Sequence, residues 1–226
     1  MAIFDRFKSD EHSEMSFIDH LEVLRGTIVR SLFSILIAFV TLFIYRDWIM
    51  DHVIMGPLYP DFITYKAFCD LSHYLHLGDS LCMPPVKVTL QSTTFGGQFL
   101  SAISMAFIGA IIVAFPFIFW QFWSFVKPAL KENELKNTRF MIFFVSFFFF
   151  AGAAFGFFIL GPFTFNFLAG FQLGTRGAVT TIPTFADYID NLTNLILGCG
   201  IAFEMPVIMF LLTKIGIVTP KFLRSV

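Results

Sequence analysis

Four long apolar stretches constrain what this chain can fold into more than any other feature of its sequence. A transmembrane helix needs about 20 predominantly apolar residues, and four windows reach that length, at roughly 27–45, 99–126, 140–168 and 188–213. Of the 226 residues, 57% are hydrophobic and 14% are charged, whereas a soluble domain is about 25% charged. We therefore expect an all-α, polytopic membrane protein with four transmembrane helices in this chain.

The distribution of lysine and arginine predicts the direction in which the spans run. The cytoplasmic flanks of membrane helices are enriched in these residues. Of the 15 in the chain, eleven lie before or early in the first window, between the second and third, or after the fourth. This predicts that both ends of the chain are cytoplasmic and that the loop 46–98 is external. Residues 1–15 are then a polar cytoplasmic tail, and 16–226 form the membrane domain.

The chain has no sequence signature of catalysis. It contains no glycine-rich phosphate loop, no nucleophile elbow and no clustered His, Asp and Glu set, so nothing predicts an enzyme, a cofactor or a nucleic-acid partner. Cys69 and Cys82 both fall in the predicted external loop, where an oxidising environment permits a disulfide. The alternatives are two free thiols, or a metal site that also uses His73 and His76.

One carboxyl group interrupts the fourth window. Glu204 precedes Lys214 by ten residues, which is about 15 Å at the helical rise and places it near the middle of the bilayer. An ionised carboxylate is costly there, so we expect Glu204 to be neutral or hydrogen-bonded, for instance to the Ala202 carbonyl that Pro206 leaves without a donor. The functional alternatives are docking of a partner helix and proton transport.

Two further segments place acidic residues at the predicted cytoplasmic surface. The stretch "SFIDHLEVLR" at 16–25 has apolar residues at helical spacing, which predicts an amphipathic helix that runs along the membrane surface into the first span, with Glu22 and Arg25 paired at i, i+3. In "WQFWSFVKPALKENEL" at 120–135, aromatic residues including Phe125 form an interfacial belt. Glu134 follows in an otherwise positive loop. Taken alone, each pattern is typical of a solvated face.

Together these segments resemble one family, TatC, the multi-spanning receptor subunit of the twin-arginine protein translocase. The resemblance covers the chain after the first dozen residues, and 203–224 is its most specific part. It implies a non-enzymatic subunit of the cell inner membrane that binds twin-arginine signal peptides of folded proteins, whose export is driven by the proton gradient. The matching segments are "SFIDHLEVLR", "GPL" at 56–58, "FWQFWSFVKPALKENE", "FNFLAGF" at 165–171 and "FEMPVIMFLLTKIGIVTPKFLR" at 203–224.

The resemblance implies roles for particular residues and partners. Glu134 matches the family's acidic position in the first cytoplasmic loop and is expected to bind the signal peptide, together with Glu22 and Arg25. The partners implied are single-span helices of the TatA and TatB type, the lipid bilayer and further copies of the chain within a larger complex. The remaining matches are Glu204 and Pro206, expected to dock a partner helix, and Pro57 and Phe125, expected to be structural.

The sequence departs from the family pattern in two places. The usual motif His-Leu-x-Glu-Leu-Arg here reads "HLEVLR" from His20. Val23 therefore stands at the usual glutamate position, and Glu22 lies one residue earlier, about 100° around a helix. Family members have six spans and this chain stops before the fifth, which implies a fragment or a truncated protein. A different class, an ion- or proton-coupled transporter or channel subunit that uses Glu204, is the alternative function.

Overall fold

The structure is a computed structural model that describes residues 17–79, 82, 89–126, 138–171 and 182–214. Apart from one isolated β-bridge between Gln91 and Thr184, the regular elements of the described residues are all helices, and these residues contain no strand. Four helical segments are long and apolar enough to cross a membrane. The prediction of an all-α membrane fold with four spans is confirmed. The four segments are Leu21–Ile44, Gly97–Val126, Met141–Gly170 and Phe185–Phe210.

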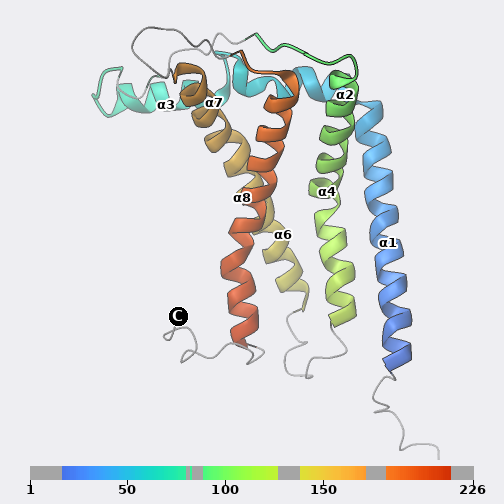
Figure 1. Ribbon diagram of the computed structural model, residues 1–226. Helices are drawn as coiled ribbons and strands as arrows, with labels where there is room; N and C mark the ends of the chain where they lie inside the picture. Colours follow the sequence, from blue (N-terminus) through green and yellow to red (C-terminus); the bar gives the residue numbers. More distant parts are fainter. Residues whose placement is uncertain (1–16, 80–81, 83–88, 127–137, 172–181, 215–226) are drawn as a thin grey trace, which may run out of the picture.

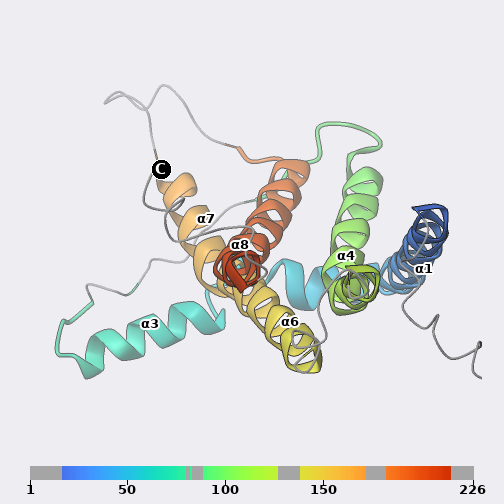
Figure 2. The same ribbon diagram turned by 90° about the horizontal axis from the view of Figure 1, so that it is seen from below.

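The spans stand side by side, with α1 at one edge of the bundle (Figures 1 and 2). α1 packs against α4, and α8 packs against both α4 and α6. The third span is composite, because α6 continues through the π-helical segment η5 into α7. The elements in chain order are α1 (Phe17–Ile44), α2 (Arg46–Ile49), η2 (Met50–Ile54), η3 (Gly56–Leu58), α3 (Ile63–Tyr74), α4 (Gly97–Val126), α6 (Thr138–Phe155), η5 (Gly156–Leu160), α7 (Gly161–Gly170) and α8 (Phe185–Lys214).

The helix predicted at 16–25 does run into the first span, since α1 is one uninterrupted helix, but the bend that a course along the membrane surface would need is not observed (Figure 1). The 28 residues of α1 give a length of about 42 Å, whereas the hydrocarbon core of a bilayer is about 30 Å thick. The polar residues Glu22 and Arg25 lie in the first turns of this helix. These turns therefore extend the axis of the span beyond the apolar layer.

The elements α2, η2, η3 and α3 of the connection 46–98 cover one end of the bundle (Figure 1). One tyrosine hydroxyl group attaches this cap to a span, and a second holds two elements of the cap together. Tyr188 of α8 donates a hydrogen bond to the Ile54 carbonyl at 2.5 Å, and Tyr65 of α3 donates to the carbonyl of buried Pro57 at 2.8 Å. Burial raises the pKa of the Tyr65 phenol above its ordinary value of 10.0, so this hydroxyl remains a donor at neutral pH.

Glycines allow α6 and α8 to approach each other closely. A Cβ atom at Gly152 would lie 2.5 Å from the Cys199 carbonyl oxygen, and one at Gly156 would lie 2.7 Å from the Leu195 carbonyl oxygen. These two glycines are four residues apart and face the same helix. Such spacing of small residues is a common packing motif between membrane helices, because it brings the two backbones into contact.

We expect Gly152→Val to lower the thermal unfolding temperature of the detergent-purified protein, because α6 and α8 must separate to accept the side chain. Overpacking of this kind costs roughly 1–3 kcal/mol of unfolding free energy. Gly198→Val is the matched control, since a Cβ atom at Gly198 meets nothing within 4 Å. Equal unfolding temperatures for the two variants would contradict the close approach of these helices.

Candidate functional site

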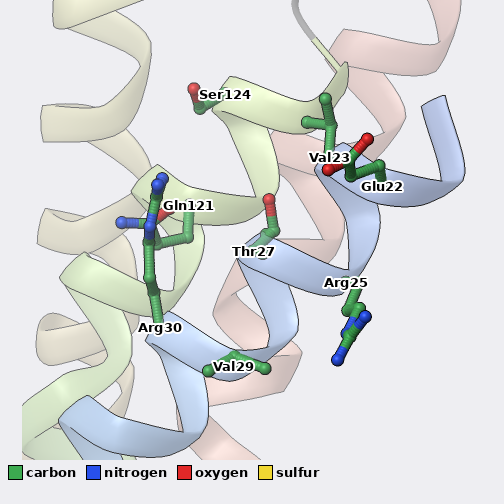
Figure 3. Close-up of a pocket in the computed structure, with 9 residues that line it drawn as sticks. Glu22, Val23, Arg25, Thr27, Val29, Arg30, Gln121 and Ser124 are labelled. Carbon is green, nitrogen blue, oxygen red and sulfur yellow. The ribbon is translucent and has the colours of Figure 1, made fainter. Parts of the chain in front are cut away.

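A pocket of about 650 Å³ lies between the first turns of α1 and the last turns of α4. The first turns of α1 lie at the end of the bundle opposite the α2–α3 cap (Figure 1), and Figure 3 shows the lining residues in close-up. The helical period of α1 brings side chains from successive turns into this pocket, and α4 closes it on one side. The lining residues are Glu22, Val23, Arg25, Gly26, Thr27, Val29, Arg30, Gln121 and Ser124.

The pocket accommodates the departure from the family motif. Glu22 and Val23 both line it, although neighbouring residues on a helix point about 100° apart. Both side chains leave α1 near its start, toward the end of the pocket where Ser124 of α4 lies (Figure 3). An acid displaced by one position therefore still borders the same pocket.

The predicted ion pair between Glu22 and Arg25 is absent from the described structure, so that expectation is wrong. No salt bridge joins them, and the two side chains leave the helix in different directions (Figure 3). Both are exposed, and an exposed pair on a helix contributes only about 0.3–0.5 kcal/mol. Arg30 and Gln121 of α4 both line the pocket.

The second predicted ligand for a signal peptide, Glu134, lies outside the described residues. It follows Val126, the last residue of α4, by eight positions, so the polypeptide attaches it to the same helix that forms one wall of the pocket. In the last turns of α4, Phe125 is half-buried. Trp123 is buried, and its Nε1 has no hydrogen-bond partner among the described residues.

Glu204 is buried in α8, with 5% of its surface exposed. Neither carboxyl oxygen has a hydrogen-bond partner within the described part of the chain. The Phe149 backbone is close enough to interact with the carboxyl group, but the two do not meet the distance and angle of a hydrogen bond. The predicted bond to the Ala202 carbonyl is therefore not formed. Pro206 is exposed and lies inside the uninterrupted α8.

Three spans meet around Glu204. One turn before it, Gly200 lies against the Phe149 ring of α6, and that ring stacks on Phe115 of α4 with centroids 3.6 Å apart. Ser146, one turn before Phe149 on α6, also has a buried hydroxyl that finds no partner in the described structure. With Trp123, each of α4, α6 and α8 thus contributes one buried polar group that lacks a hydrogen bond among the described residues.

The connection between α1 and α4 holds a second group of polar side chains. Cys69 of α3 and Cys82 form a disulfide, and His73 Nε2 lies 3.1 Å from Asp79 Oδ1. His76, which was considered as a metal ligand from the sequence, is not part of this group. Cys199, the third cysteine, is a free thiol in α8.

Several residues of these sites are missed by sequence reasoning. Gln121 and Ser124 join the pocket only because α4 packs beside α1, and Thr27 and Arg30 enter it one and two turns after Glu22. Gly152 and Gly156 carry a recognisable signal, since small residues spaced by four are typical of close helix packing in membranes. Trp123 and Ser146 carry none, because their burial depends on the arrangement of three helices.

Comparisons with known proteins agree on one family. A family model described as Sec-independent protein translocase protein (TatC) matches residues 19–226. The Sec-independent protein translocase protein TatC of Blattabacterium sp. subsp. Periplaneta americana (strain BPLAN) is 36% identical over 217 residues, which cover 96% of this chain and 81% of that protein. The protein of the same name from Campylobacter jejuni subsp. jejuni serotype O:2 is 31% identical over 205 residues, covering 91% and 74% respectively.

The same family is found among solved structures. A crystal structure of the twin arginine translocase receptor TatC in DDM superimposes with a TM-score of 0.68 at 27% sequence identity. The match covers 91% of this chain and 80% of that one.

Proposed function

Since this chain belongs to the TatC family of Sec-independent protein translocase proteins, we propose that it binds the twin-arginine signal peptides of folded proteins. Family membership makes it a non-enzymatic, multi-pass subunit of a protein translocase in the cell membrane. The proposed function adds the ligand, the residues that bind it, and the partners with which the subunit assembles.

The position of Glu22 in the α1–α4 pocket carries this proposal. A guanidinium group is always charged, and its planar fork fits the two oxygens of a carboxylate. Glu22 is exposed, borders the pocket and makes no salt bridge in the described structure. Its carboxylate is thus available to one peptide arginine, and we assign Glu134 to the second.

Bulk charge does not explain recognition at this pocket, because its described lining includes two arginines and one glutamate. A ligand with two positive charges is therefore selected by the geometry of paired guanidinium and carboxylate groups. Lysine has the same charge but lacks the planar fork. Replacement of the two peptide arginines by lysine is accordingly expected to weaken binding.

The lysine and arginine distribution orients this pocket toward the cytoplasm. On that orientation both ends of the chain are cytoplasmic and the α2–α3 cap is external. The pocket then faces the compartment in which folded cargo waits with its signal peptide. This orientation is part of the proposal, and it rests on the sequence pattern together with the location of the pocket at the opposite end from the cap.

We assign the region around Glu204 to docking of a TatA- or TatB-type helix, within a complex that holds further copies of the chain and exports cargo by the proton gradient. A buried polar group without a hydrogen bond costs roughly 1–3 kcal/mol, so a polar side chain on a partner helix would be stabilised here. Proton transport is less well supported, because Glu204 is the one Asp, Glu, Lys, Arg or His among the buried described residues. A relay needs a second group.

Photo-crosslinking from the pocket tests the proposed ligand. With a benzophenone amino acid at Gln121 or Ser124, a twin-arginine peptide is expected to crosslink, and the matched twin-lysine peptide is expected to crosslink weakly or not at all. Val113 is the control position, since it lies on the same helix, is 59% exposed and is outside the pocket. Equal crosslinking of both peptides, or crosslinking from Val113 alone, would count against the proposal.

A further inference from the structure

We propose that the Cys69–Cys82 pair is a redox-gated metal site, which binds a zinc-like divalent cation when its disulfide is reduced. The cation would be held by the two thiolates and His73, with Asp79 orienting the histidine. This site lies on the α3 side of the molecule and is separate from the α1–α4 pocket and from Glu204. It does not depend on the proposed function.

The three ligand groups are already close together. One ligand atom each from Cys69, His73 and Cys82 lies within 4.8 Å of the others. Cys69 and His73 are four residues apart on α3 and therefore share a face of the helix. In a tetrahedral zinc site, bonds of about 2.0–2.3 Å place neighbouring ligand atoms roughly 3.3–3.8 Å apart. Small side-chain movements therefore bring the three ligand atoms to this spacing once the S–S bond is broken.

Hydrogen bonds, in addition to the disulfide, hold the turn that brings Cys82 to α3. The fully buried Ser72 donates through its hydroxyl to the Gly78 carbonyl at 2.6 Å. The Leu77 amide donates to the Ser72 carbonyl at 3.0 Å, and the Cys82 amide donates to the Asp79 carbonyl at the same distance. Reduction therefore leaves the two cysteines near each other, where a metal can bind both.

Asp79 supplies the carboxylate partner that metal-binding histidines commonly have. Its Oδ1 lies 3.1 Å from His73 Nε2 and 3.8 Å from Cys82 Sγ. Such a partner fixes the tautomer of the imidazole and makes it a better ligand. Two thiolates and one imidazole leave a fourth position for water.

The chemistry requires two separate steps. In the first, a dithiol reductant is oxidised to its disulfide, and the S–S bond between Cys69 and Cys82 breaks as each sulfur gains one electron and one proton. In the second, the cation forms bonds to both sulfurs and to His73, and the two thiol protons pass to solvent. No atom changes oxidation state in the second step. The bound metal then protects the thiolates from reoxidation.

Cobalt titration of the purified full chain tests this site. In a Cys199→Ser background, after reduction with a phosphine, we expect one Co²⁺ per chain, with thiolate-to-cobalt charge-transfer absorption and the visible bands of tetrahedral coordination. Zn²⁺ should displace it. The oxidised chain is expected to show neither absorption. Failure of the reduced chain to bind, or equal binding by the oxidised chain, would overturn the proposal.

Two matched substitutions identify the ligands. His73→Ala is expected to remove the tetrahedral spectrum, whereas His76→Ala, an exposed histidine of the same turn, is expected to leave it unchanged. Asp79→Asn is expected to weaken cobalt binding by about 10–100-fold. These variants retain both cysteines, so formation of the disulfide under oxidising conditions serves as the check that the turn is folded. Equal losses from His73→Ala and His76→Ala would contradict the assignment.

Discussion

Glu22→Lys is expected to lower the affinity of the chain for a twin-arginine peptide by at least tenfold and up to about 100-fold. A hydrogen bond to a charged group contributes about 1.5–3 kcal/mol, and each 1.4 kcal/mol is a factor of ten. The new ammonium group would also repel the incoming guanidinium groups. Fluorescence anisotropy of a labelled peptide, titrated with purified protein, measures the dissociation constant.

The same experiment includes two controls. A twin-lysine peptide is expected to bind weakly to both the original chain and the variant. The double substitution of Glu22→Val with Val23→Glu moves the acid to the usual family position. Because both positions border one pocket, this variant is expected to bind the twin-arginine peptide at least as well as the original chain. An affinity that does not change with Glu22→Lys would show that this carboxylate is not a ligand.

Glu204→Leu is expected to abolish export of a twin-arginine cargo while leaving the thermal stability of the subunit unchanged or higher. The substitution removes a buried carboxyl group that has no hydrogen bond in the described structure, so the fold loses no interaction and no longer buries an unpaired polar group. A docking partner, however, loses the group that would bind it. Interhelical hydrogen bonds in membranes contribute about 0.6–2 kcal/mol each. If several partner helices dock in one complex, the free energy lost is the sum over all of them.

Thr193→Val is the matched control for this prediction. Thr193 is also buried on α8, but its hydroxyl donates to the Ile189 carbonyl of its own helix at 2.7 Å. It is therefore satisfied without a partner, and export is expected to continue. Export is measured as the amount of a twin-arginine cargo protein that leaves the cell interior. The substitutions are made in a full-length version of the subunit that is active in export. Full export by the Glu204→Leu variant would contradict a docking role, and a marked fall in its stability would indicate a structural role instead.

The spans were predictable because the bilayer imposes one requirement on every residue that crosses it. Backbone polar groups in lipid must be satisfied internally, so apolar windows at 99–126 and 188–213 become α4 and α8. The predicted course of 16–25 along the membrane surface was wrong for a related reason. An amphipathic first turn and a membrane span have the same helical period, and periodicity alone does not reveal whether the chain bends between them.

The sites could be predicted only in part, because they combine helices that are distant in sequence. The sequence indicated Glu22 as a candidate ligand but did not reveal that Val23 borders the same pocket, since that depends on where α4 packs. The ion pair expected between Glu22 and Arg25 failed because long exposed side chains lose entropy when they are held together. Asp79, the carboxylate beside His73, was likewise invisible, because the turn after α3 is defined by hydrogen bonds of buried Ser72.

A double-mutant cycle between Glu22 and the peptide arginines tests the central claim most directly. Glu22→Gln in the protein is combined with arginine-to-lysine changes in the peptide, and the four dissociation constants give a coupling energy. If the carboxylate binds a guanidinium group, we expect the two changes to be non-additive by about 1 kcal/mol or more. Additivity to within about 0.5 kcal/mol would show that the two groups do not touch, and would contradict recognition of the signal peptide in this pocket.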